Sequence, residues 1–134
     1  NVYKSLNNLK NNNNIIYIYM SNFKNTKSFE KRKNESKHIR QKYPDRIPII
    51  CERGKDNNIK DIDKNKYLVP ADLTIGQFIY IIRKRIKMNA EQSLFLFINN
   101  KIPPTSKTIA TMYDENKDED GFMYVVYTGE NTFG

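Results

Sequence analysis

The sequence is poor in the residues from which most metal centres and many active sites are built. Its 134 residues include one cysteine, one histidine and no tryptophan. A single cysteine excludes an internal disulfide, and one cysteine with one histidine cannot form a structural zinc site. Cys51 ends an apolar run and is expected to be a buried, inert thiol, whereas His38 lies in a basic segment and is expected to be solvated. We therefore predict no metal site and no cofactor.

Other signatures of catalysis and of membrane insertion are missing as well. The chain shows no Ser/His/Asp set, glycine-rich phosphate loop or paired-carboxylate pattern, and it has only five glycines. The apolar stretch IIYIYM at 15–20 is too short to span a bilayer, and asparagines rather than basic residues precede it. The sequence thus predicts a cytoplasmic protein that is not an enzyme and has no catalytic residues.

Positive charge is abundant but is confined to one segment. The formal net charge is +8, and residues 21–46 carry nine Lys and Arg against three acids, while residues 47–134 carry twelve of each. The basic character therefore belongs to an N-terminal segment and not to the domain as a whole.

Composition divides the chain into three parts. Residues 1–19 are asparagine-rich and of low complexity, which predicts disorder; an alternative is that YKSL, from Tyr3 to Leu6, or IIYIY lies in a groove as an added strand. Met20 is expected to be a natural start. Residues 20–46 are expected to form a helical segment, and residues 47–134 a folded domain with a C-terminal tail.

Periodicity and capping signals predict the elements of that domain. A helix is expected from the N-cap Ser28 to Tyr43, with Phe29 packing it onto the domain, and Pro44 ends it. The clearest helix starts at Thr74, where Thr74 and Gln77 have capping-box spacing. Strands are predicted in RIPIICE, NKYLVP, SLFLFIN and GFMYVVYTG, and a short helix in IATMYDEN. SLFLFIN is apolar on both faces and is therefore expected to be central.

This order of elements is typical of an α+β ubiquitin-like β-grasp, with a mixed four-stranded sheet preceded by one or two N-terminal helices. The last strand is expected to be central and to direct the tail TGENTFG away from the domain. The strand KYLV is a candidate free edge, because it is short, carries lysines and is ended by Pro70, which are features that guard exposed edges.

Long stretches of the chain resemble the autophagy ubiquitin-like modifiers, closest to the GABA-receptor-associated protein (GABARAP) branch. The resemblance runs from about Met20 to Gly134 and rests on the combination of KYPDRIP, KYLVP, FLFINNKIPPTS and a C-terminal aromatic-glycine pair. One departure is Ser28, which stands where the animal GABARAP pattern has proline, so the entry angle of the first helix is left open.

The resemblance implies a function for the C-terminal residues. Gly134 would be the lipid attachment point, passed by E1-like and E2-like conjugation enzymes to the amine of phosphatidylethanolamine, and Phe133 would be read by a cysteine protease that also removes the lipid. Glycine suits this role because it lacks Cβ, can thread a narrow channel and does not crowd the attacked carbonyl. The protein would then be found on the autophagosome membrane when lipidated.

The resemblance also implies recognition of cargo receptors that carry short acidic-aromatic motifs of the form aromatic-x-x-aliphatic. An extended peptide can add to a free sheet edge while pockets select its side chains. The implied aromatic pocket comprises Glu35, Ile39, Pro48, Ile50, Lys66, Leu68 and Phe122; the aliphatic pocket comprises Tyr67, Val69, Pro70, Leu73, Phe78 and Ile81; and Arg46, Lys64 and Arg85, with Lys66, form a basic rim. The alternative for the apolar members is that they belong to the core.

Two other functions compete with this hypothesis. The first is a non-conjugated adaptor that links vesicles or receptors to microtubules, in which the basic helices contact tubulin; those helices could equally present a solvated face. The second is a basic nucleic-acid-binding domain, which the neutral body and the lack of an RNA-binding motif argue against. We therefore expect no nucleic-acid partner.

Overall fold

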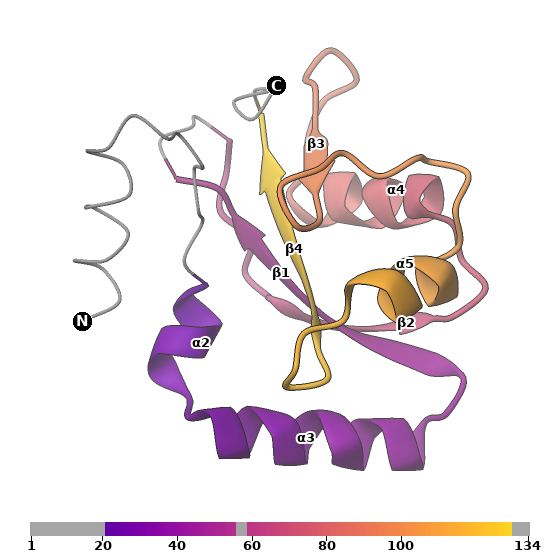
Figure 1. Ribbon diagram of the computed structural model, residues 1–134. Helices are drawn as coiled ribbons and strands as arrows, with labels where there is room; N and C mark the ends of the chain where they lie inside the picture. Colours follow the sequence, from indigo (N-terminus) through magenta and orange to yellow (C-terminus); the bar gives the residue numbers. More distant parts are fainter. Residues whose placement is uncertain (1–20, 56–58, 130–134) are drawn as a thin grey trace.

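The structure is a computed structural model that describes residues 21–55 and 59–129 (Figure 1). The elements are α2 (Asn22–Thr26), α3 (Phe29–Lys42), β1 (Arg46–Arg53), β2 (Lys66–Pro70), α4 (Ile75–Arg85), β3 (Phe95–Phe97), α5 (Ile109–Asn116) and β4 (Met123–Thr128). The predictions made for residues 1–19, Met20, Phe133 and Gly134 lie outside the described residues.

The four strands form one mixed sheet in the order β2-β1-β4-β3. β1 pairs antiparallel with β2 and parallel with β4, and β3 pairs antiparallel with β4. Two helices, α2 and α3, precede the sheet in the described part of the chain. The predicted α+β ubiquitin-like β-grasp is confirmed, with β4 in the interior of the sheet and β2 at an edge, as expected.

The prediction that SLFLFIN forms a central strand is wrong. β3 covers only Phe95–Phe97 and lies at the edge opposite β2. Leu96, Phe97 and Ile98 are nevertheless buried, because the segment pairs with β4 on one side and joins the core that α4 and α5 complete. An apolar run on both faces reports burial, and burial can come from covering helices and loops as well as from neighbouring strands.

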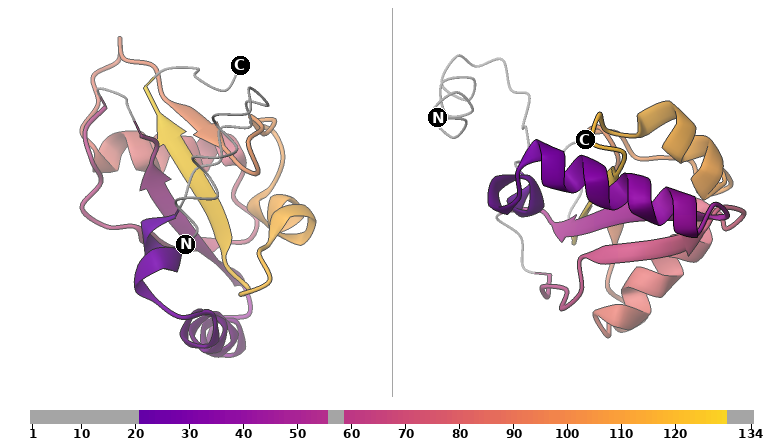
Figure 2. Two further views of the ribbon diagram at one scale, coloured as in Figure 1. Left: turned by 60° about the vertical axis from the view of Figure 1, so that its left-hand side comes forward. Right: turned by 90° about the horizontal axis from the view of Figure 1, so that it is seen from below.

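Alternation along β1 sends its side chains to two different layers. Ile47, Ile49 and Cys51 point into the main core, which also contains the buried residues of α4. Ile50 points to the other face, into a small cluster with Phe23 and Phe122. The sheet therefore lies between α4 on one side and the α2–α3 pair on the other, as the two views in Figure 2 show.

Helix α4 forms as its sequence predicts. Thr74 accepts a hydrogen bond from the Gln77 N–H at 3.2 Å, and the Gln77 side chain accepts one from the Thr74 N–H at 2.9 Å, which completes the capping box. Ile75, Phe78 and Ile82 are fully buried at helical spacing. This apolar stripe packs against one face of the sheet and buries it.

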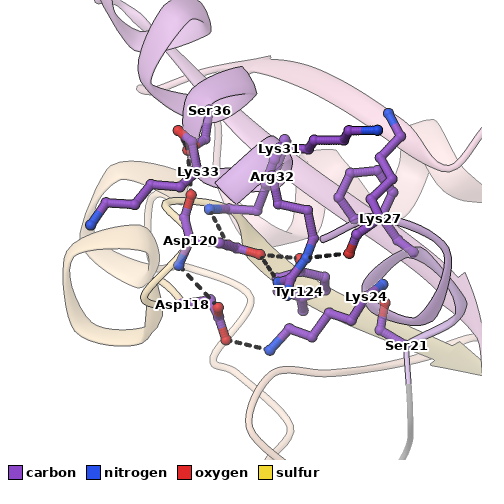
Figure 3. A network of polar contacts seen from close by, with 12 residues as sticks. Ser21, Lys24, Lys27, Lys31, Arg32, Lys33, Ser36, Asp118, Asp120 and Tyr124 are labelled. Atoms are coloured by element: carbon purple, nitrogen blue, oxygen red, sulfur yellow. Dashed lines mark hydrogen bonds and ion pairs between the residues drawn. The ribbon is translucent and has the colours of Figure 1, made fainter. Parts of the chain in front are cut away.

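Helix α3 is held by buried polar contacts, which the sequence analysis did not anticipate, and by the apolar contact of Ile39 with the sheet. Phe29 is 41% exposed and does not pack the helix onto the domain; its ring lies beside Arg32 and Lys33 instead. The buried residues of α3 are Arg32 and Ser36. Both contact Asp120, in the loop that leads to β4, as Figure 3 shows.

Asp120 is the centre of this network. One of its carboxylate oxygens accepts hydrogen bonds from Arg32 at 2.5 Å and from the Tyr124 hydroxyl, and the other accepts from the Phe122 N–H at 2.9 Å. Its backbone carbonyl accepts from the Ser36 hydroxyl. Asp120 is fully buried, so removing one partner of such a pair would cost several kcal/mol, about 3–5.

Among the described residues, no helix is long and apolar enough to cross a bilayer.

Gly121 allows the Asp120 loop to approach α3. Its φ is +90°, and a Cβ there would overlap the Ser36 hydroxyl. We predict that Gly121→Ala lowers the free energy of unfolding by about 1–3 kcal/mol, through the strained φ and the displaced helix. Urea denaturation would measure this change.

Gly76→Ala is the matched control, because Gly76 lies in the first turn of α4 and its Cβ would meet Thr105 at an ordinary 3.4 Å. It should leave stability unchanged or slightly raised. Equal losses in the two variants would contradict the account of Gly121.

Candidate functional site

The outer edge of β2 carries backbone groups that face away from the sheet. The Cys51 N–H donates to the Asn65 carbonyl and the Ala71 N–H to the Asp45 carbonyl, in a ladder that pairs Ile47 with Val69 and Ile49 with Tyr67. Antiparallel pairing alternates, so Lys66 and Leu68 present their N–H and C=O groups outward. The Arg46 guanidinium donates to the Leu68 carbonyl at 3.3 Å from this side. The edge is therefore suited to accept an extended peptide.

On the α3 side of this edge, the residues expected to form the aromatic pocket come together. The register places Pro48 opposite Leu68 and Ile50 opposite Lys66, so all four side chains lie on one face. Leu68 is 38% exposed, whereas Ile50 and Phe122 are fully buried and form a floor rather than open walls. Ile39 of α3 packs against that floor.

An aromatic residue that the sequence reading did not place in this region lies against the same floor. The Phe23 ring contacts the Phe122 ring edge-on at 5.3 Å between centroids and is only 4% exposed. Lys66 and Lys27 place their Nζ atoms 5.5 and 5.2 Å from the centre of the Phe23 ring. The signal available in the sequence was a lone aromatic in a polar segment just before α3, which is too weak to predict burial.

Glu35 joins α3 to β2 across this pocket. Its carboxylate lies 2.7 Å from Lys66 Nζ and 3.2 Å from Lys27 Nζ. Burial alone would raise the pKa of Glu35, but the hydrogen bonds from Lys66 and Lys27 outweigh burial and hold the pKa below 4.5. Glu35 is thus ionised at neutral pH and pairs with both lysines.

The opposite face of β2 and helix α4 hold the residues expected to form the aliphatic pocket. Tyr67 and Val69 are buried against α4, and the Tyr67 ring contacts the Phe78 ring edge-on at 5.9 Å. Ile81 is 37% exposed and Leu73 is half-buried. Tyr67, Val69 and Phe78 therefore form the base of this region, and Ile81 and Leu73 lie nearer the surface, together with half-buried Pro70.

The Tyr67 hydroxyl lacks a hydrogen-bond partner within the described residues. Burial is the main reason that its pKa lies above the ordinary value for tyrosine. The hydroxyl is therefore a neutral donor beneath the aliphatic region.

The expected rim cations already have partners on the protein surface. Arg85 forms an ion pair with Asp63 at 3.0 Å, Lys64 lies 5.5 Å from the Tyr67 ring centre, and Arg46 binds the Leu68 carbonyl. Exposed pairs of this kind contribute roughly 0–1 kcal/mol each and exchange readily. The rim cations can therefore leave these contacts for an acidic ligand.

A second candidate region is the carboxyl end of β4 (Met123–Thr128). The Tyr127 hydroxyl donates to the Lys60 carbonyl at 3.0 Å, and the Gly54 N–H donates to the Tyr127 carbonyl at 2.8 Å. Gly54 must be small, since a Cβ there would lie 2.6 Å from Thr128 Cγ2. The last described residues are thus held between β1 and the loop around Lys60.

A polar pocket of about 460 Å³ lies at the end of β1 and the segment that leads to β2, lined by residues such as Glu52, Arg53, Asp61 and Asp63. No group of three His, Cys, Asp or Glu side chains in the described parts of the chain is placed to hold a metal ion. Cys51 borders the pocket but is fully buried, and burial raises the pKa of its thiol, as expected for an inert residue. We find no arrangement for catalysis among these groups.

The fold and the β2 edge, which pairs with no further strand among the described residues, define a ubiquitin-like β-grasp protein with a surface suited to peptide binding. The family described as "Autophagy protein Atg8 ubiquitin like" matches residues 31–134. Autophagy-related protein 8 of Schizosaccharomyces pombe is 60% identical over 114 residues, which cover 85% of this chain and 94% of that protein. Autophagy-related protein 8c of Arabidopsis thaliana is 58% identical over 114 residues, with coverage of 85% and 96%. The chain belongs to the Atg8 family, whose members are non-enzymatic ubiquitin-like modifiers of autophagy.

Solved structures agree with this assignment. Trypanosoma brucei ATG8 is 44% identical with a TM-score of 0.81, and the match covers 87% of this chain and all of that one. Plasmodium falciparum Atg8, solved in complex with a peptide of Plasmodium falciparum Atg3, is 38% identical with a TM-score of 0.77, with coverage of 83% and 98%. The β-grasp with N-terminal helices is thus the Atg8 architecture.

Glu35 makes the stability of the fold depend on pH. Because its pKa is lowered on folding, the carboxylate contributes stability above about pH 4.5, and that contribution is lost as the pH falls through the folded-state pKa. We predict that the unfolding free energy falls less between about pH 6 and about pH 3 in Glu35→Gln than in the wild type, by up to about 1 kcal/mol. Urea titrations at the two pH values would measure the difference.

Glu30→Gln serves as the control, since Glu30 is exposed in the first turn of α3. It should behave as the wild type. An identical acid response in Glu35→Gln and wild type would show that the two lysine bridges do not stabilise the folded state.

Proposed function

We propose that this protein is a modifier of the GABARAP branch that is conjugated through Gly134 to phosphatidylethanolamine and acts in autophagosome formation. The observation that carries the proposal is membership of the Atg8 family together with a β4 strand that leads directly to the aromatic-glycine tail. The clamp on Tyr127 and Thr128 supports it, because a fixed root presents the tail in one direction.

The chemistry requires only an unhindered terminal carboxylate on this chain. An E1-like enzyme joins the Gly134 carboxylate to AMP from ATP and releases pyrophosphate, and its thiolate then displaces AMP to form a thioester. The acyl group passes by thioester exchange to the thiol of the E2-like enzyme, which frees the thiol of the E1-like enzyme. The lipid amine then attacks the thioester carbonyl, forms the amide and releases the thiol of the E2-like enzyme. Gly134 is the fifth residue after Gly129, so the carboxylate can reach at most roughly 17 Å beyond the clamp.

This proposal brings specific partners and locations. An E2-like partner is supported by the Plasmodium relative, which was solved with an Atg3 peptide. A cysteine protease that reads Phe133 would cleave the amide and return the protein from the autophagosome membrane to the cytoplasm. The conjugated protein would be held at the bilayer by the attached lipid.

The β2 edge supplies the second half of the function, which is recruitment of cargo receptors. A receptor segment of the form aromatic-x-x-aliphatic would pair with Lys66 and Leu68, placing its aromatic toward α3 and its aliphatic residue toward α4. Acidic residues that flank the aromatic would meet Arg46, Lys64 and Lys66. Such charges affect association rate and partner choice more than total affinity.

A second candidate function is a non-conjugated adaptor that uses the same groove to link vesicles or receptors to microtubules. It is favoured by the exposed basic residues of α3, among them Lys31, Lys33 and Lys37. That face would suit an acidic protein such as tubulin. The adaptor should function without Gly134, and the modifier should not.

We predict that Gly134→Ala abolishes or strongly reduces lipid conjugation, by about tenfold or more, because a methyl group crowds the attacked carbonyl. The chain would be incubated with E1-like and E2-like enzymes of the family, ATP and phosphatidylethanolamine liposomes, and mass spectrometry would locate the adduct. Gly76→Ala, at a glycine in α4, should be conjugated as the wild type. No wild-type adduct from enzymes active on a related modifier would favour the adaptor.

We predict that Lys66→Glu weakens binding of acidic-motif peptides more at low salt than at high salt, because screening reduces the unfavourable interaction. Isothermal titration at two salt concentrations would measure the change. Lys101→Glu is the matched control, since Lys101 is exposed beside β3 at the far edge of the sheet. A loss of equal size at both salt concentrations would contradict the rim role of Lys66.

A further inference from the structure

The aromatic pocket proposed for a partner's side chain already contacts an aromatic ring of this chain. Phe23 forms a buried cluster with Ile50 and Phe122, and Ile39 packs against that cluster. Lys66, the basic residue of the pocket, lies over the same ring, with its Nζ atom 5.5 Å from the ring centre. The floor and the cation that would receive a partner's aromatic therefore receive Phe23.

The other side of the pocket is not part of this contact. Pro48 and Leu68 share the sheet face with Ile50 but do not belong to the Phe23 cluster, and Leu68 is 38% exposed. An incoming aromatic side chain can thus reach the pocket along Leu68. To settle on Ile50 and Phe122, it must take the space that the Phe23 ring fills.

Helix α2, which carries Phe23, is attached to the domain by that ring and by polar contacts. It has five residues, Asn22–Thr26, and Phe23 is the buried one among them. A helix this short is unstable by itself in water, because nucleation is costly and few hydrogen bonds follow. The position of α2 therefore depends on the Phe23 ring and on the polar ties around it.

Those ties lie along the helix, and at its C-cap Lys27 forms an ion pair with Glu35 and accepts a hydrogen bond from Arg32 Nε on its carbonyl. Glu52 accepts hydrogen bonds from the Ser21 hydroxyl at 2.6 Å and from the Phe23 N–H at 3.1 Å. Lys24 forms an ion pair with Asp118 at 2.5 Å, with both side chains partly exposed. The main core under α4 is a separate cluster, so α2 can move without opening it.

We propose that Phe23 is a built-in occupant of the aromatic pocket, which a partner's aromatic side chain must displace. The proposal rests on the recognition of aromatic-x-x-aliphatic peptides proposed above. Only molecules in which the Phe23 ring has left the pocket can bind the peptide's aromatic residue. The smaller this fraction is, the weaker the apparent affinity becomes. Phe23 then sets a threshold that favours peptides whose aromatic residue outcompetes a phenylalanine ring.

The experiment is isothermal titration of an aromatic-x-x-aliphatic peptide with acidic flanks into the full chain. Phe23→Ala should lower Kd about fivefold, because the pocket no longer has an occupant. Phe29→Ala is the matched control: it is the same substitution six residues on, at a ring that is 41% exposed beside Arg32 and Lys33. It should leave Kd unchanged.

A second variant covers the possibility that Phe23→Ala perturbs the fold. Ser21→Ala keeps the ring and the net charge but removes the N-cap of α2 and a hydrogen bond to Glu52. It should lower Kd about twofold, in the same direction as Phe23→Ala. A peptide with alanine in place of its aromatic should bind all variants equally, since it has no ring to place in the pocket and so has no need to displace Phe23.

Two results would overturn the proposal. Unchanged or weaker binding by both Phe23→Ala and Ser21→Ala, with wild-type binding intact, would make Phe23 a wall of the pocket and leave the proposed function standing. Absence of binding by the wild type and by both variants would overturn peptide recognition itself, and the occupant with it.

Discussion

The position of α3 on the sheet depends on the contacts of one buried group, the carboxylate of Asp120. It receives the Arg32 guanidinium, the Tyr124 hydroxyl and the Phe122 N–H, and it thereby joins α3 to the strand that leads to the tail. Because Glu35 and Ile39 belong to α3, the same contact that closes the domain also positions one side of the candidate binding site. A buried ion pair fixes how two elements are oriented more than it raises the free energy of unfolding. The cost of removing both charges from water offsets much of the attraction between them.

This polar attachment also explains why the N-terminal helices were harder to predict than the sheet. A capping box and an apolar stripe in the sequence predict α4, and the structure contains both. The fully buried residues of α3 are Arg32 and Ser36, which no hydrophobic pattern can identify. Of its apolar residues, Ile39 packs against the sheet and Phe29 is exposed. A buried arginine is recognisable only together with its partner, and Asp120 lies 88 residues away.

Part of the candidate site could be predicted from the sequence, and part could not. The alternation of β2 placed Lys66 and Leu68 on one face and Tyr67 and Val69 on the other, and that part followed from the sequence. The position of β3 did not, because a short apolar strand can be buried by covering elements at an edge as well as by two neighbours. Phe23 escaped notice because its burial arises from tertiary contacts with Phe122 and Ile50 in a segment whose own composition is polar.

The proposed function uses two regions, the β2 edge and the tail, which lie at different strands of one sheet. The groove follows β2 at one edge, while the tail continues from β4, which lies two positions away in the order β2-β1-β4-β3. β1 pairs with both strands and is buried on both faces, so it fixes the distance between the groove and the root of the tail. A protein tethered by its last residue can therefore keep its groove open to partners, because the bond to the membrane and the bond to a receptor use different strands. The weak exposed pairs of Lys66 and Arg85 fit this division, since they exchange partners readily, whereas the clamp at Tyr127 is buried and holds the tail root in place.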